Sequence, residues 1–503
     1  MTHAATRIFL LCSALLLAGC GAGGTETHGD CTGLRPDGSV FTNACDGRLY
    51  AAAGASVITP DDQNHPCTKY LGGTSRDRIA DGVCTDLRAS ALVLEQDGLP
   101  FVLVSLDLVG YLQGDVERIL DLLEPRGIPR KNVVVASIHT HEGPDTIGIW
   151  GAGFSSSGRC PAYMDFLTQT VADLVLGLAA SMQAVTVTAA ETPINDAGSD
   201  HPALQQDFRY PEVLNNRLTA ARFANTSGDT VATLVNWHTH PEAMITSSHY
   251  SADFPHWTRE KLEERYGGVS VYFSGTVGGL STPLDLSVPQ YTIGGEPLTS
   301  DGEPVYVSEN SEIKTFSLGY HLAYLVADLL DDAPTVEPKL SLAAEPLDIP
   351  VTNAMLDLMM AVGIISPLPL ITDNPDYCGN YGCMRHMLQL LSIGTLHMVS
   401  LPGEVFPETS VGRPLVEKDW GEPWGVFTYP AMTGYRAALP SGHLLMEFGL
   451  ANNEMGYVVP ESDMQPSGHP NFYCEEQCYA LTGEALLRQA VTDLLTRTLA
   501  PTP

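Results

Sequence analysis

The chain has 503 residues, of which 44% are hydrophobic and 17% are charged, and this is the composition of a folded globular protein. Its formal net charge is −33, with 26 Lys and Arg residues against 59 Asp and Glu residues. This balance, together with the lack of any basic run, excludes nucleic acid as an expected partner and by itself says nothing about the substrate.

The first 19 residues have the pattern of an export signal. Arg7 supplies a positive charge, residues 8–18 form an apolar stretch, and the letters LAGC end at Cys20 as in the lipobox cut by bacterial lipoprotein signal peptidase. The sequence therefore predicts an exported lipoprotein of the cell envelope, held to a membrane by lipid on Cys20. The alternative is an ordinary secretory signal followed by an incidental cysteine.

A polar, Gly-rich tether follows the signal, so residues 20–48 are predicted to be a flexible, irregular segment. We expect one large folded domain over residues 49–500, because no later stretch has the composition of a linker. No other run approaches the roughly 18 apolar residues that a membrane span requires.

The cysteines are expected to form disulfides, because an exported chain permits them. Close spacing favours the pairs Cys378–Cys383 and Cys474–Cys478, then Cys31–Cys45 and Cys67–Cys84, which leaves Cys160 over. Spacing ranks these pairs but does not fix their connectivity.

Apolar patterns predict strands and helices along the whole domain. The expected strands cover 87–94, 100–109, 133–138, 185–191, 218–223, 230–237, 269–274, 340–351 and 395–400. The expected helices cover 114–123, 162–182, a segment within 251–266, 312–330 and 483–499. The order strand, helix, strand over 100–138 predicts a βαβ unit, so the expected fold class is α/β, with mixed β-sheets flanked by helices.

The segment 355–371 is rich in Met, Leu and Ile. Ordinary core packing is its expected role, and an apolar lip for a lipid tail is the alternative. Its Asp, Gly and Pro residues make it neither a membrane span nor one regular helix.

Residues 132–144, NVVVASIHTHEGP, end an apolar strand in two histidines and a Gly-Pro turn. Because side chains alternate along a strand, His139 and His141 are expected on the same face. Neutral imidazoles suit zinc, so the pair could share a metal. A pair of hydrogen-bonded surface histidines is the plainer interpretation of one such motif.

The pattern recurs at 231–241, VATLVNWHTHP, where His238 and His240 follow a second predicted strand. Two matched pairs at strand ends make a metal site assembled from separate strands the leading hypothesis.

These motifs and later ones, in order, resemble the catalytic domain of the neutral, non-lysosomal ceramidase family, zinc-dependent amidases that cleave the N-acyl bond of ceramide. The resemblance runs from about residue 52 to residue 484. It rests on HTHEGP at 139–144, NWHTHPEAM at 236–244, SGTVGGLSTP at 274–283, LPGE at 401–404 and GLANNEMGYVVP at 449–460.

Residue by residue, the resemblance implies that His139, His240, Glu404 and Tyr457 hold one zinc ion per chain. Two imidazoles, a carboxylate and a phenol oxygen suit such a cation and leave a position for water. The resemblance also implies that His141 donates a hydrogen bond to the developing oxyanion or shuttles a proton. Taken alone, Glu404 also fits a lone acid after a Pro-Gly turn, and Tyr457 fits a half-buried core tyrosine.

Three further residues each have more than one possible role. Ser281 aligns with a family serine that has a part in catalysis, but it lacks the preceding acid, so it is either catalytic or a turn-capping serine. His238 stands where the family usually has no histidine, and it is a second base, a second metal ligand or a packed neighbour. Asp253 either orients a histidine or caps the helix that follows it.

The sequence therefore predicts a lipid-anchored zinc hydrolase of a carbon–nitrogen amide bond, with ceramide or another N-acyl lipid as the leading substrate. The first alternative is an esterase or amidase that acts on small polar substrates with the same site. The second is a non-catalytic, metal-binding envelope lipoprotein. The sequence names no protein partner.

Overall fold

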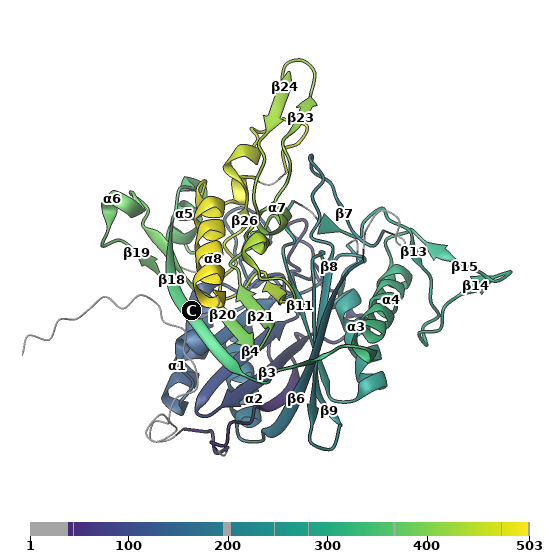
Figure 1. The fold of residues 1–503 in the computed structure, drawn as a ribbon. Helices are drawn as coiled ribbons and strands as arrows, with labels where there is room; N and C mark the ends of the chain where they lie inside the picture. Colours follow the sequence, from purple (N-terminus) through teal and green to yellow (C-terminus); the bar gives the residue numbers. More distant parts are fainter. Residues whose placement is uncertain are drawn as a thin grey trace, which may run out of the picture.

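Figure 1 shows the computed structural model, which describes residues 39–43, 45–194, 203–245, 247–279, 281–365, 369–473 and 475–500. The predicted signal, Cys20 and most of the tether lie outside the described residues.

The larger sheet has nine strands in the order β11-β9-β8-β6-β1-β3-β4-β5, and β17 pairs with β6. The strands are β1 (Tyr50–Val57), β3 (Arg88–Gln96), β4 (Leu99–Leu106), β5 (Val133–Ser137), β6 (Gln183–Pro193), β8 (Arg217–Asn225), β9 (Thr230–Trp237), β11 (Val269–Ser274) and β17 (Thr335–Val336). Two parallel pairs are joined by helices: β4 and β5 by α1 (Gln113–Leu123), and β9 and β11 by α3 (Phe254–Tyr266). The predicted βαβ unit is therefore confirmed.

The smaller sheet has the order β18-β20-β21-β25, with β19 paired to β20. Its strands are β18 (Leu340–Pro350), β19 (Leu370–Ile371), β20 (Cys383–Ile393), β21 (Leu396–Ser400) and β25 (Leu444–Phe448). The remaining α-helices are α2 (Pro161–Ala179), α4 (Glu312–Asp331), α5 (Ala354–Ala361), α6 (Pro375–Cys378), α7 (Pro407–Val411) and α8 (Gly483–Leu499).

Helices and sheets pack in four layers because strand side chains alternate between two faces. On β3, Ala91 and Val93 belong to the core shared with α1 to α4, whereas Leu92 and Leu94 face the smaller sheet. The outer face of the smaller sheet is covered by α8, which lies across β18, β20 and β21 in Figure 1. The predicted α/β fold with mixed sheets and flanking helices is confirmed.

The two edge strands of the larger sheet, β5 and β11, come together although they stand at opposite ends of its strand order. The hydroxyl of Ser274, at the end of β11, donates to the carbonyl of Ile138, just past β5, at 2.6 Å. The chain after β25 lies against both, since Gly449 N donates to Ser274 O and Asn452 N donates to Val135 O. The sheet therefore curls and gathers at one place the loops that follow β5, β9, β11 and β25.

The disulfides agree with the sequence prediction only in part. Cys378–Cys383 is formed, as predicted. The pair Cys67–Cys84 is wrong, because Cys67 bonds Cys160 and Cys84 is free. Spacing missed this bond because the fold brings together cysteines that are 93 residues apart. Cys31 and Cys474 lie outside the described residues, and Cys478 is a free, buried cysteine.

No helix in the described part of the chain combines the length and the apolar character that crossing a membrane requires.

Candidate metal centre and active site

His139 and His141 lie in the loop after β5, not on the strand as predicted. His139 has φ 70°, a left-handed conformation that is uncommon for residues other than glycine. The turn still brings the two rings together, with their Nε2 atoms 3.4 Å apart. Alternation along a strand was therefore the wrong reason for expecting the two imidazoles on one face, although they do lie together.

Backbone carbonyls fix the orientation of two of the histidines. His139 Nδ1 donates to Val109 O at 2.6 Å, and His240 Nδ1 donates to Ser281 O at 2.9 Å. A carbonyl oxygen only accepts, so Nδ1 carries a proton in each ring, and when a ring is neutral its Nε2 turns a lone pair inward.

Glu404 comes from the two-residue strand β22 (Glu404–Val405), which pairs in parallel with β26 (Tyr457–Val458). In this register Glu404 lies directly opposite Tyr457. Glu404 Oε2 is 3.2 Å from His139 Nε2 and 3.3 Å from His240 Nε2. Close packing sets its position, because a side chain at Gly278 would place Cβ 2.6 Å from Glu404 O.

The donor set fits a metal ion. His139, His141 and His240 form a buried group whose ligand atoms all lie within 4.8 Å of one another. Tetrahedral zinc with bonds of about 2.1 Å separates its ligand atoms by roughly 3.4 Å. Three separations here match that value. Glu404 Oε2 lies 3.2 Å from His139 Nε2 and 3.3 Å from His240 Nε2, and the Nε2 atoms of His139 and His141 are 3.4 Å apart.

The charges in this group also favour a cation. Burial lowers the pKa of His139, but the carboxylate of Glu404 outweighs burial and raises it to about 9. Burial acts to raise the pKa of Glu404, and the two neighbouring imidazoles instead hold it well below its usual range. The pKa of His141 is well below its usual value, because of burial and the neighbouring imidazoles. The group therefore keeps its carboxylate ionised and draws positive charge to the Nε2 atoms.

Two buried carboxyl groups, Glu142 and Glu242, lie near the histidines, and the sequence analysis gave neither of them a role. Glu242 Oε2 lies 3.4 Å from His141 Nδ1, and Glu142 Oε1 lies 3.8 Å from an Arg78 nitrogen. Burial raises the pKa of both carboxyl groups. Each acid stands within a quoted motif, Glu142 directly after His141 and Glu242 two residues after His240, and this place next to a predicted site histidine was the available signal.

Ser281 is placed away from the pocket, with its hydroxyl donating to His238 O at 2.6 Å in a fully buried position. Its carbonyl accepts from both His240 N and His240 Nδ1. The structure therefore gives Ser281 the part of positioning His240, and it does not bring the hydroxyl to the histidine group.

His238 faces in another direction from His240. Its Nδ1 accepts from Thr276 N at 2.9 Å, and its Nε2 lies 3.7 Å from Glu447 Oε2. Glu447 also accepts from Asn215, Ser410, Tyr435 and Arg436. Of the three interpretations, the packed neighbour in a buried polar network fits this position.

Asp253 caps α3. One carboxylate oxygen accepts from Phe254 N at 2.7 Å and the other accepts from Met244 N at 3.0 Å. Burial raises the pKa of Asp253 to about 6. Of the two predicted roles, the structure shows the helix cap, which also ties down the loop that follows His240.

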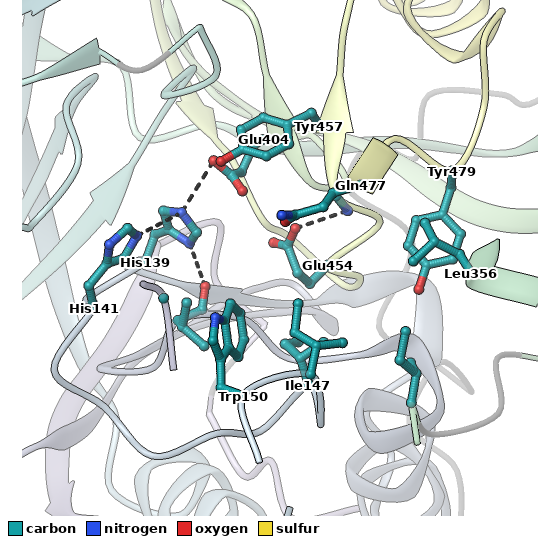
Figure 2. Close-up of a pocket in the computed structure, with 15 residues that line it drawn as sticks. His139, His141, Ile147, Trp150, Leu356, Glu404, Glu454, Tyr457, Gln477 and Tyr479 are labelled. Atoms are coloured by element: carbon teal, nitrogen blue, oxygen red, sulfur yellow. Dashed lines mark hydrogen bonds and ion pairs between the residues drawn. The ribbon is translucent and has the colours of Figure 1, made fainter. Parts of the chain in front are cut away.

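A pocket opens beside the histidine group (Figure 2). His139, His141, Glu404 and Tyr457 line its polar end. The rest of the lining is mainly apolar and includes Ile147, Ile149, Trp150, Leu356, Ile365 and Tyr479. Leu356 and Ile365 belong to the segment 355–371, where core packing was expected; they are buried, and they also form part of the pocket wall.

No protein-family model and no curated protein sequence matches this chain. Among solved structures, the chain is similar to neutral ceramidase from Pseudomonas aeruginosa, with 15% identity over 91% of this chain and 76% of that chain and a TM-score of 0.65. It is also similar to a ceramidase complexed with C2, with 13% identity, the same coverage and a TM-score of 0.63. The chain has the neutral ceramidase fold. The fold expected from the motif resemblance is thereby confirmed, although few residues are shared.

Proposed function

We propose that this chain is a zinc-dependent hydrolase that cleaves the N-acyl amide bond of ceramide or a related N-acyl lipid. The observation that carries the proposal is a buried histidine group with a carboxylate at the polar end of a largely apolar pocket. An N-acyl lipid has the matching form, because its amide group is flanked by hydrocarbon. The two solved structures to which the chain is similar are ceramidases, which makes ceramide the first substrate to test.

In this proposal His139, His240 and Glu404 hold one zinc ion, and Tyr457, opposite Glu404 in the strand pair, is the fourth ligand. A bound zinc ion polarises the amide carbonyl and makes water a stronger nucleophile at neutral pH. The carbonyls of Val109 and Ser281 keep the two imidazoles turned toward the ion.

His141 moves the proton. Amide hydrolysis adds water to the carbonyl carbon, breaks the C–N bond and leaves the amine nitrogen with one more proton. His141 Nε2 lies beside the ligand group, where it can accept the proton of water. Glu242 Oε2 lies 3.4 Å from Nδ1 of the same ring. In this proposal His141 Nε2 then passes the proton to the leaving amine.

Two observations weigh against the alternatives. A small polar substrate leaves the apolar part of the pocket unfilled, so an N-acyl lipid is the better fit. A coordination shell closed by His238 would favour the non-catalytic binding lipoprotein, and His238 instead faces Glu447.

We further propose that lipid on Cys20 holds the enzyme at a membrane of the cell envelope, close to its substrate. The lipobox at residues 17–20 supports this. Fractionation of cells expressing the Cys20→Ala variant tests it: the full-length protein should leave the membrane fraction, and a variant that stays there would contradict the proposal.

The function is tested by zinc content and N-acyl-sphingosine hydrolysis, measured on the same samples. The His139→Ala/His240→Ala double variant should lose both the roughly one zinc per chain and the activity. His249→Ala, an exposed histidine on β10 (His249–Tyr250), is the control and should keep both. Metal retained by the double variant would show that the site is wrong, and zinc without turnover of any N-acyl lipid would show that the reaction is wrong.

A further inference from the structure

Glu454 is a second carboxyl group in the pocket, between the histidine group and the apolar side chains (Figure 2). Its Oε1 accepts from Gly456 N at 3.0 Å. Its Oε2 is buried and has no hydrogen-bond partner among the described residues. An unpaired buried polar atom is unfavourable, so a ligand that bonds Oε2 relieves that cost on binding.

The surroundings hold Glu454 in place. A side chain at Gly110 would put Cβ 2.6 Å from Glu454 Cγ, so the glycine makes room for the acid. Two residues earlier, Asn452 has φ 59°, and its backbone and side chain exchange hydrogen bonds with Val135 of 2.7 and 2.9 Å. These bonds hold the backbone before Glu454, while Gly110 and the hydrogen bond from Gly456 N hold the side chain itself.

The charges near Glu454 restrict what Oε2 can bind. His139 and Glu404 are close enough to act on it electrostatically, and burial raises the pKa of Glu454 well above its usual value. A substrate ammonium group would lie next to the proposed zinc site and be repelled by it, and a substrate carboxylate would lie between two acids. A hydroxyl group is uncharged and both donates and accepts, so it pairs with the carboxyl group in either protonation state.

We infer that Glu454 is a specificity-determining residue that binds a hydroxyl group on the carbon chain beside the scissile amide. The inference rests on the proposed amidase function and deepens it, because it selects hydroxylated N-acyl amides over plain ones. The order of groups along the pocket agrees with this substrate: amide at the histidines, hydroxyl at Glu454, and hydrocarbon against Ile147, Leu356 and Tyr479.

The test compares two substrate pairs on zinc-loaded protein. The first pair is an N-acyl amino alcohol and the N-acyl alkylamine of equal length; the second is a 2-hydroxyacyl and a plain acyl alkylamide. The wild type should prefer the hydroxylated member of at least one pair by about 10- to 100-fold in kcat/KM, as expected for a hydrogen bond to a buried carboxyl group. Glu454→Leu should reduce this ratio to within about threefold, and Glu454→Gln, which keeps the size and a polar terminus, should retain most of it.

A second readout is independent of catalysis. Calorimetric binding of the same pairs to zinc-free protein should show the same preference in Kd, again lost in Glu454→Leu and kept in Glu454→Gln. No preference in the wild type overturns the inference, as does an equal fall of kcat/KM for both members of a pair in Glu454→Leu. Zinc-loaded wild type that hydrolyses no N-acyl amide refutes the proposed function instead, and the binding preference then decides the inference alone.

Discussion

Replacing Ser281 by alanine distinguishes a serine that takes part in catalysis from one that only positions His240. The hydroxyl donates to His238 O at 2.6 Å in a fully buried position. Removing it leaves that carbonyl without this donor, so the free energy of unfolding should fall by about 1–3 kcal/mol. The backbone carbonyl of Ser281, which holds His240, is untouched, so kcat per zinc-loaded chain should stay within about threefold of the wild type.

A catalytic hydroxyl would behave differently, because removing a nucleophile lowers kcat by about 10⁴-fold or more. The assays are urea denaturation, zinc content and N-acyl-sphingosine hydrolysis on one preparation. Ser274→Ala is the matched control, since its buried hydroxyl also donates to a backbone carbonyl, that of Ile138, at 2.6 Å. It should lose similar stability and no activity. A Ser281→Ala protein that is stable and fully loaded with zinc but a thousandfold slower would refute the reasoning.

Three further changes test other parts of the structure. His141→Ala should keep zinc yet lower kcat by about 10²- to 10⁴-fold, as the loss of a proton-transfer group does, and elemental analysis that finds the zinc gone would make His141 a ligand. Gly73→Ala should destabilise the protein by about 1–2 kcal/mol and lower kcat with zinc retained, because Gly73 has φ 100° and a Cβ there would lie 2.5 Å from His141 Cγ; unchanged kinetics would contradict this contact. His386 is buried on β20 and does not line the pocket at the histidine group, and burial lowers its pKa to about 4. The unfolded state therefore binds more protons below pH 6.5, and stability falls as the pH falls from about 6.5 to 4. In His386→Gln the loss of unfolding free energy between pH 7 and 4 should be smaller by about 3 kcal/mol, measured by urea denaturation at each pH, and an identical loss in both proteins would rule out this contribution.

Local pattern was enough for most of the regular elements. The strand at 269–274, the helix at 483–499 and the βαβ unit ending at β5 follow from runs of β-branched or periodic apolar residues, and the structure has them within a few residues. Burial of one or both faces decides the conformation of these segments. The buried positions recur in the sequence at intervals of two residues in strands and about 3.6 residues in helices. Strands β20 and β25 were not predicted, because their sequences mix polar and apolar residues and take their conformation from the neighbouring strands.

The sequence by itself determined that two HxH motifs end strands and that an acid and a tyrosine follow in LPGE and in the motif at 449–460. It did not determine which side chains would meet. His238 and His240 are only two positions apart in the sequence. The loop after β9 nevertheless turns His238 toward Glu447 and His240 toward Glu404. Glu454 carried no signal beyond its presence in a motif.

Only the tertiary structure decided these points, because each depends on contacts across the chain. The curled sheet brings β5 and β11 together, the pairing of β22 with β26 sets Glu404 opposite Tyr457, and glycines such as Gly278 allow the loops to approach that closely. The direction of a side chain after a strand is set by backbone turns and by distant carbonyls, and neither is encoded in the periodicity of the strand itself. The sequence thus specified the ligand types, and the packing of separate loops specified the site.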